Sequence, residues 1–291
     1  MLGVHSGRWE GLQLYFLHNI TLYPRPYEEG DCIYSVQQMS VFNKGALELC
    51  CQQKILPSIV LSNDWFTGLL PAYGKNPHFF GETFRGTTFF HIVHNLERGY
   101  EGDVYVPDHL RAKLDRIHGL NIDLVYDMAR RRSSFNPSRC ALLASDQWGT
   151  VSKTYRKDLL RTSPLRDLLA RFPTAFGFPN GVNVADRTRI LHETVGSDHL
   201  KAKEKLQQKY FGYKELDDSV MVMGFVGRIT RQKGIHLIVE TAEELIHHFG
   251  HKVNILVGGM KFKNDKYGED CAKLMYYLRD KYPSCFWGAP E

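Results

Sequence analysis

The chain has 291 residues, of which 43% are apolar and 24% are charged, a composition that excludes a disordered protein and allows two hydrophobic cores. Its net charge of +5 is mild, so an anionic small molecule suits it at least as well as nucleic acid, and the basic run Arg130-Arg131-Arg132 is most simply a solvated loop. No apolar run approaches the length of a membrane span, and the N-terminus lacks the apolar block of a signal peptide. We therefore expect a cytoplasmic protein without membrane or nucleic-acid partners. A plastid location stays open if the N-terminus is truncated.

Three short apolar runs in the first half of the chain end in polar residues, which is typical of buried strands. These runs are Ser58–Leu61, Thr87–Val93 and Cys140–Ala144. Helical patterns over Val36–Gln52 and Thr154–Leu160 accompany them. This alternation predicts a mainly parallel sheet with helices on its faces.

Polar side chains follow these predicted strands, at Asp64, His94 and Ser152. Ligands of parallel sheets bind at the carboxyl ends of the strands, so these residues are candidates for a site. Asp64 could equally cap the following helix, and both roles can hold at once. A lone histidine at a strand end is, before context, more often structural than catalytic.

The segment Phe178–Asn183 breaks the pattern and precedes a polar, lysine-rich helical stretch that runs to about Tyr210. We place the domain boundary here. The sequence predicts an N-terminal Rossmann-like domain over residues 1–179 and the first part of a second one over residues 180–291.

The second domain opens with a buried-strand pattern over Val220–Val226, which leads into Gly227 and a loop carrying Arg228 and Lys233. A glycine at the strand exit lets the backbone approach a ligand closely, and the start of a helix attracts anions. The loop therefore predicts a phosphate site. A surface loop of solvated cations is about equally compatible with this motif taken alone.

A helix with a clear apolar stripe follows over Ile235–Phe249, with Thr230 as the expected N-cap and Gly250 as the stop. The remaining predicted elements are a strand over Val253–Val257 before Gly258-Gly259, a helix over Gly268–Lys281 and a strand over Cys285–Trp287. The glycine pair is a candidate for close approach of the backbone to a nucleotide, a role that two glycines indicate only weakly. His247, His248 and His251 lie at a helix C-terminus, which favours a dipole role over a metal site.

Five blocks in chain order share their pattern with one enzyme family. They are Ser62-Asn-Asp-Trp-Phe-Thr-Gly-Leu-Leu-Pro71, His91-Ile-Val-His-Asn-Leu96, Asp146-Gln-Trp-Gly-Thr-Val-Ser152 with Tyr155, Pro179-Asn-Gly-Val-Asn183, and Gly227-Arg-Ile-Thr-Arg-Gln-Lys-Gly-Ile-His-Leu-Ile238. They resemble the segments H-D-W-H-T-A-L-x-P, H-N-L, A-D-x-x-x-T-V-S-x-x-Y, P-N-G-V-D and G-R-L-T-x-Q-K-G-x-x-L-I of the starch synthase and bacterial-type glycogen synthase family.

The resemblance implies a GT-B fold, in which two Rossmann-like domains bind a sugar nucleotide between them. By match to the family's motifs, Arg228 and Lys233 would neutralise the donor diphosphate, and His94 would lie near the donor glucose. The same match assigns Asp64 to sugar binding and Asn180 to the crossing between domains. We group Gly227, Gly258 and Gly259 with the nucleotide site.

The expected reaction is transfer of glucose from ADP- or UDP-glucose to the non-reducing end of an α-1,4-glucan with retention. No two aspartates have the D-x-D spacing of metal-dependent transferases, so we expect neither metal nor cofactor besides the donor. The alternatives are a related retaining transferase that makes trehalose, sucrose or an α-1,3-glucan, and a non-catalytic glucan-binding or regulatory protein.

The sequence departs from the family pattern at several places. No K-x-G-G-L loop precedes Leu14, and the family's E-x-x-x-x-G loop would lie beyond Glu291, so we expect an incomplete piece of a longer synthase. Within the blocks, Asn63 replaces a histidine, Glu101 a glutamine and Asn183 an aspartate. The sequence leaves the donor base, the acceptor length and the oligomeric state open.

Overall fold

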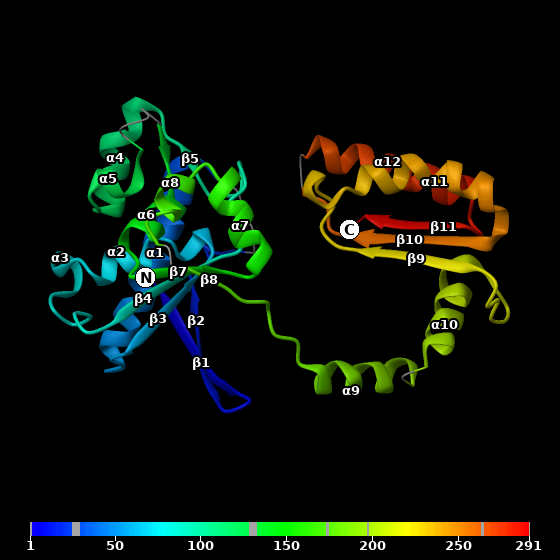
Figure 1. Cartoon of the computed structure of the whole chain (residues 1–291), viewed down its shortest axis with the longest axis horizontal. Coiled ribbons are helices and arrows are strands. Elements are labelled where there is room, and N and C mark those ends of the chain that lie inside the picture. Colours follow the sequence, from blue (N-terminus) through cyan, green and yellow to red (C-terminus); the bar gives the residue numbers. More distant parts are fainter. Residues whose placement is uncertain are drawn as a thin grey trace. The chain divides into compact units, whose positions relative to one another are not determined.

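The computed structural model describes residues 2–24, 30–127, 133–172, 175–196, 198–262 and 265–290. The chain divides into two compact units, Met1–Gly181 and Val182–Glu291 (Figure 1). This division lies close to the predicted boundary between residues 179 and 180. The basic run from Arg130 to Arg132 lies outside the described residues.

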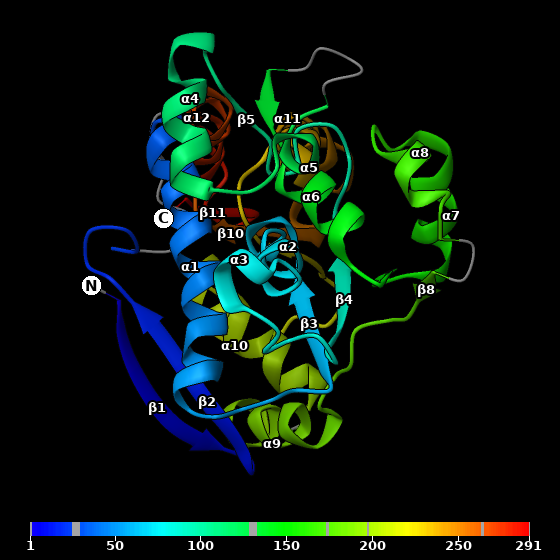
Figure 2. The ribbon, with the colours of Figure 1, turned by 90° about the vertical axis from the view of Figure 1, so that its left-hand side faces the viewer.

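Unit 1 contains a four-stranded parallel sheet in the order β3-β4-β7-β8 (Figure 1). Figure 2 shows β3 and β4 running in the same direction. Its strands are β3 (Ile59–Asn63), β4 (Thr88–Val93), β7 (Gln147–Thr150) and β8 (Phe176–Gly177). Two antiparallel pairs lie outside this sheet, namely β1 (Gly3–Trp9) with β2 (Leu12–His18) and β5 (Val104–Tyr105) with β6 (Ser134–Phe135). The parallel α/β architecture predicted from the sequence is confirmed.

Helices surround the sheet of unit 1 and supply two apolar clusters. They are α1 (Cys32–Gln52), α2 (Leu70–Gly74), α3 (Pro77–Phe80), α4 (Asp108–His118), α5 (Ile122–Val125), α6 (Pro137–Ala144), α7 (Lys153–Thr162) and α8 (Arg166–Leu169), with a short 3₁₀ turn η1 (Trp65–Thr67). The larger cluster joins α1 and α2 to the sheet through Met39, Tyr73 and Phe89. The smaller cluster packs α7 against β7 through Trp148 and Leu159.

The strand predicted over Cys140–Ala144 is wrong, because this run forms the end of α6. The Asn136 side chain accepts a hydrogen bond from the Arg139 N–H at 2.8 Å, and Pro137 occupies the first turn, so a helix start is built in just before the run. Alanine and leucine are also strong helix formers. Five consecutive apolar residues are compatible with either structure, and the cap decides between them.

The true third strand, β7, begins just after Asp146, so this carboxylate lies at the amino end of the sheet. Its Oδ2 accepts a hydrogen bond from the Phe89 N–H at 2.8 Å, and its own N–H donates to the Phe89 carbonyl at 2.9 Å. Lys75 Nζ lies 2.5 Å from its Oδ1. Asp146 thus aligns β7 beside β4.

Unit 2 contains a three-stranded parallel sheet in the order β11-β10-β9. Its elements are α9 (Val184–Val195), α10 (His199–Phe211), β9 (Met221–Val226), the 3₁₀ turn η3 (Arg231–Lys233), α11 (Ile235–Phe249), the 3₁₀ turn η4 (Gly250–Lys252), β10 (Val253–Gly259), α12 (Lys266–Lys281) and β11 (Phe286–Pro290). Figure 1 shows α11 and α12 on the same face of the sheet, where Val239, Ile255 and Met275 form the core.

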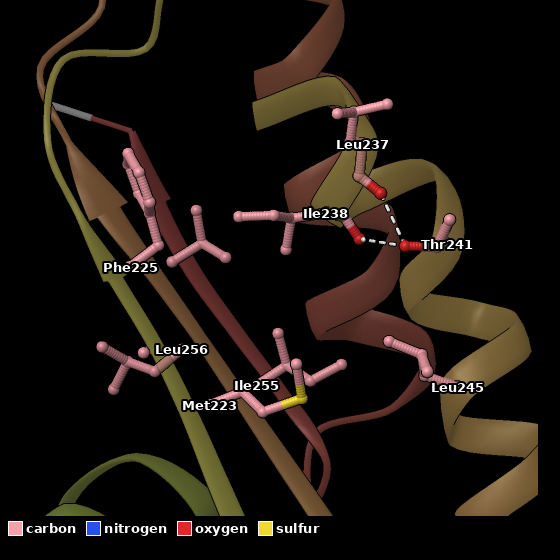
Figure 3. Close-up of a pocket in the computed structure, with 10 residues that line it drawn as sticks. Met223, Phe225, Leu237, Ile238, Thr241, Leu245, Ile255 and Leu256 are labelled. Atoms are coloured by element: carbon pink, nitrogen blue, oxygen red, sulfur yellow. Dashed lines mark hydrogen bonds between the residues drawn. The ribbon is translucent and has the colours of Figure 1, made fainter. Parts of the chain in front are cut away.

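The prediction that β9 is a buried strand is wrong in one respect. The strand forms, but it lies at an edge of the described sheet, and Val226 is 82% exposed. Beside it, an apolar groove of about 310 Å³ runs between the strands and α11, lined by residues that include Met223, Phe225 and Leu245 (Figure 3). The hydrophobic pattern predicted the strand correctly. Whether the strand is buried depends on neighbouring strands and helices, which the pattern does not specify.

A buried histidine joins β3 and β4, two neighbouring strands of the parallel sheet in unit 1. His91 on β4 is 1% exposed, and its Nδ1 lies 2.9 Å from the hydroxyl of Ser62 on β3. Burial lowers the pKa of His91 from its ordinary 6.5 to about 3. The imidazole is therefore neutral in the folded protein.

Of the helices that the structure describes, none combines the length and apolar composition needed to cross a membrane.

Replacement of Asp146 by alanine should lower the free energy of unfolding by about 1 to 2 kcal/mol, because the Phe89 N–H loses a charged acceptor. The Lys75→Met variant, which removes only a half-exposed ion pair, should lose less than about 1 kcal/mol. Urea unfolding of both variants measures the difference. Equal losses would show that Asp146 acts through Lys75 alone.

Acidification should destabilise the fold through His91. Its folded-state pKa lies below the unfolded value, so the unfolded chain binds a proton that the folded chain excludes, and stability falls as pH drops from 6.5 toward 3. Between pH 7 and 5.5 the loss from this residue should be about 1 kcal/mol. Denaturant titrations at both pH values should show a smaller pH effect in His91→Gln; an unchanged effect would contradict a buried neutral imidazole.

Candidate functional site

The predicted residues of unit 1 lie together at the carboxyl edge of its sheet. Asp64 directly follows β3, His94 directly follows β4, and Ser152 caps α7 just beyond β7. The register pairs Asn63 with Ile92 and Val93 with Thr150, so the strand ends are level. The sheet therefore brings these side chains to one edge.

The backbone of Asp64 is strained. Its φ of 61° and ψ of 175° fall in a region that is almost confined to glycine and costs about 1 to 3 kcal/mol for other residues. Hydrogen bonds hold this geometry: the Asp64 N–H donates to the Ile92 carbonyl at 2.9 Å, and the Thr67 hydroxyl donates to the Asn63 carbonyl at 2.7 Å. Strain of this kind is common at functional sites.

Asp64 also has an unusual electrostatic environment. Burial raises the pKa of its carboxyl group, while a hydrogen bond from the Trp65 N–H at 3.0 Å and the nearby His94 ring act in the opposite direction. The carboxylate caps the 3₁₀ turn η1, which confirms the capping role. Its role in sugar binding stays a prediction.

The turn that carries His94 is clamped by Tyr155 of α7. The Tyr155 hydroxyl accepts the Leu96 N–H at 3.0 Å and donates to Asn95 Oδ1 at 3.1 Å. The same Asn95 oxygen accepts the Glu97 N–H at 2.8 Å. Two of the five sequence blocks are therefore in direct contact. The sequence contained Tyr155 in its motif but gave no indication of this bond.

The glycines of the predicted nucleotide site in unit 2 meet at the carboxyl ends of β9 and β10. The Gly227 N–H donates to the Gly258 carbonyl at 3.0 Å, and a β-carbon on Gly259 would lie 1.8 Å from the Gly227 carbonyl oxygen. No side chain fits between these strands at that point. The close approach of the two strands therefore explains why a glycine is needed at position 259, which the sequence alone did not indicate.

The start of helix α11 differs from the prediction. The helix begins at Ile235 after Gly234, whose φ is 68°, and Thr230 instead precedes the 3₁₀ turn η3 without a capping bond from its side chain. A side chain from α12 caps the start of the helix, because the Tyr267 hydroxyl accepts a hydrogen bond from the His236 N–H at 3.1 Å. Only tertiary packing brings Tyr267 there, so no local signal reveals it.

The cations of the loop lie between β9 and α11. Arg228 is partly buried and Lys233 is exposed in the turn η3. The Lys233 N–H donates to the Thr230 carbonyl at 3.0 Å, which closes the turn. Asn180 is exposed in the segment between β8 and α9. The roles assigned to Arg228, Lys233 and Asn180 stay predictions.

The three histidines near the end of α11 have separate partners. His247 Nε2 lies 2.9 Å from the Tyr282 hydroxyl, His248 packs on Phe249, and His251 Nδ1 lies 3.5 Å from the Ser284 hydroxyl. Across the described ranges, no group of three or more His, Cys, Asp and Glu side chains is arranged to hold a metal ion.

The strain at Asp64 predicts a reversal of the usual order of glycine and alanine. In most positions alanine is the more stable by about 0.5 to 1 kcal/mol. Here Asp64→Gly should be more stable than Asp64→Ala by about 1 to 3 kcal/mol, because only glycine adopts this backbone freely. Thermal or urea unfolding of the two variants decides, and an alanine variant of equal or greater stability would argue against the strain.

The chain is similar to known glycogen synthases over most of its own length. The glycogen synthase of Lachnospira eligens is 26% identical over 302 residues, covering 96% of this chain and 61% of that protein. The glycogen synthase of Aeromonas salmonicida is 28% identical over 272 residues, covering 88% and 53%. The chain thus spans about half to three fifths of the length of these relatives.

Solved structures show the same fold. The catalytic domain of starch synthase IV from Arabidopsis thaliana, bound to ADP and acarbose, matches with a TM-score of 0.76 at 19% identity, covering 100% of this chain and 59% of that one. A trehalose-phosphate synthase from Burkholderia vietnamiensis matches with a TM-score of 0.57 at 10% identity, covering 100% and 62%. These likenesses confirm the expected fold class.

A sequence model of the starch synthase catalytic domain matches residues 1–171. This match includes the strand-end blocks of Asp64 and His94 and the helix that carries Tyr155. It extends over more than half of the chain, which therefore belongs to the starch synthase catalytic domain family.

Proposed function

We propose that this protein is a glucosyltransferase that moves glucose from ADP- or UDP-glucose to the non-reducing end of an α-1,4-glucan, with retention. The observation that carries the proposal is the placement of Asp64 and His94 at one sheet edge, in a chain of the starch synthase family. The names of the relatives, which are glycogen synthases, support it. ADP in the Arabidopsis structure supports a nucleotide-sugar donor.

The chemistry gives each unit a separate task. Cleavage of the bond between glucose and phosphate builds negative charge on the departing diphosphate, and fixed cations stabilise charge where it develops. Arg228 and Lys233 supply such cations beside the close approach of Gly227 and Gly259. In unit 1, Asp64 and His94 offer hydrogen-bonding groups for sugar hydroxyls, held by a turn that cannot easily shift.

The cofactor requirement, the cellular location and the base of the donor are part of the proposal. The chain is expected to act without a metal or further cofactor, in the cytoplasm, on a donor whose base is undetermined. The glucan acceptor is supported by the family. Trehalose, sucrose or α-1,3-glucan synthesis, and a non-catalytic glucan-binding role, are outcomes that the experiment below separates.

The reaction is tested with radiolabelled ADP- or UDP-glucose and glycogen, with label in precipitated polymer as the measure, on the protein purified together with any coding sequence that flanks these 291 residues. The label should be released by an exo-acting α-1,4-glucanase. Lys233→Met and Arg228→Met should each lower the rate about 100-fold or more, because each removes a charge that stabilises the leaving group. Lys273→Met, on an exposed lysine of α12 that pairs with Asp270, is the matched control.

Full transfer by the Lys233 and Arg228 variants would refute this assignment of the phosphate site. A folded chain that binds ADP by calorimetry but transfers no glucose would favour the glucan-binding or regulatory role. Label that resists α-1,4-glucanase would point to one of the other transferases.

A further inference from the structure

Asn63 is the last residue of β3 and lies beside His94. Its Cα is paired with that of Ile92 across the two strands, which places it next to the turn after β4. The Asn63 Oδ1 atom lies 3.3 Å from His94 Nε2. An amide oxygen only accepts hydrogen bonds, so this contact requires the proton of the neutral imidazole to be on Nε2.

The backbone around both residues is fixed, so the contact does not depend on two loose side chains. The Asn63 carbonyl accepts the Thr67 hydroxyl at 2.7 Å, and the next residue is held to Ile92 by the Asp64 N–H. On the other side, Tyr155 clamps the residues that follow His94. Both side chains therefore start from Cα positions that hydrogen bonds define.

The contact itself is exposed and of moderate length, as expected for a site without its ligand. Hydrogen bonds of catalytic groups are often long in unliganded structures and tighten when substrate binds. Among the described residues, the structure gives the Asn63 amide no other hydrogen-bond partner than the His94 ring. The amide is therefore available for this one task.

We propose that Asn63 is a positioning residue, which orients the His94 ring and holds it as the tautomer protonated on Nε2. His94 Nδ1 is then a hydrogen-bond acceptor, and a hydroxyl group of the sugar donates to it. This inference rests on the proposed glucosyl transfer. The starch synthase pattern has a histidine at position 63, so this way of fixing the tautomer belongs to this chain.

Asparagine and histidine at this position differ in what they specify. A histidine partner has one donor and one acceptor nitrogen and exchanges them freely, so it accepts either tautomer of His94. An amide that presents its oxygen selects one. The sugar hydroxyl that faces His94 is then required to donate, which restricts the orientation of the bound glucose.

The tautomer can be measured in the whole chain by ¹⁵N NMR of its imidazole nitrogens at alkaline pH. The chain has 13 histidines, and loss of signals in His94→Gln assigns the pair from His94. In the wild type, His94 Nε2 should be fully protonated and Nδ1 unprotonated. The Asn63→Asp variant, whose side chain only accepts, should give the same pattern.

The Asn63→Ala variant should shift both His94 nitrogens toward values averaged over two tautomers. The control is Asn121→Ala, which removes an asparagine cap on α5 in the same unit and should leave both signals unchanged. A wild-type His94 protonated on Nδ1, or signals that do not move in Asn63→Ala, would overturn the proposal.

Kinetics of glucose transfer supply a second readout. Asn63→Ala should lower kcat about 2- to 10-fold, the effect of one ordinary hydrogen bond, with little change in KM for the donor. A rise in donor KM at unchanged kcat would contradict a positioning role. If the wild type transfers no glucose, the proposed function fails, and the NMR result still decides whether Asn63 fixes the tautomer.

Discussion

The parallel pairing of β3 with β4 is the constraint on which the site of unit 1 depends. Their register pairs Asn63 with Ile92, and the Asp64 N–H extends the ladder one residue further to the Ile92 carbonyl. Because parallel strands end at the same edge, residues that are 29 positions apart, such as Ser62 and His91, or 31 apart, such as Asn63 and His94, become neighbours. This pairing brings Asn63 next to His94, and it brings the buried ring of His91 next to the hydroxyl of Ser62.

The same edge concentrates strain and polarity in a few residues. Asp64 combines an unfavourable backbone conformation with a partly desolvated carboxylate. Thr67 and Tyr155 hold the turns after β3 and β4 by hydrogen bonds. Such an arrangement costs stability that the core of the unit must supply. In return, the side chains need little reorganisation when a ligand arrives, which is the usual requirement for precise positioning.

Patterns that are local in sequence predicted much of the structure. The strands before Asp64 and His94 and the glycine-rich loop after β9 follow from hydrophobic periodicity and turn residues. The strand predicted over Cys140–Ala144 was wrong because five consecutive apolar residues fit both a helix and a strand. The cap by Tyr267, the exposure of β9 and the clamp by Tyr155 could not be predicted, since each depends on how distant elements pack.

The proposed function requires the loop from Gly227 to Gly234 to hold the diphosphate of a sugar nucleotide. A crystal structure of the chain with ADP tests it most directly. Phosphate oxygens should lie about 3 Å from the side chains of Arg228 and Lys233, next to the close approach of Gly227 and Gly259. ADP bound elsewhere, for example along the apolar groove beside β9 (Figure 3), with this loop empty, would contradict it.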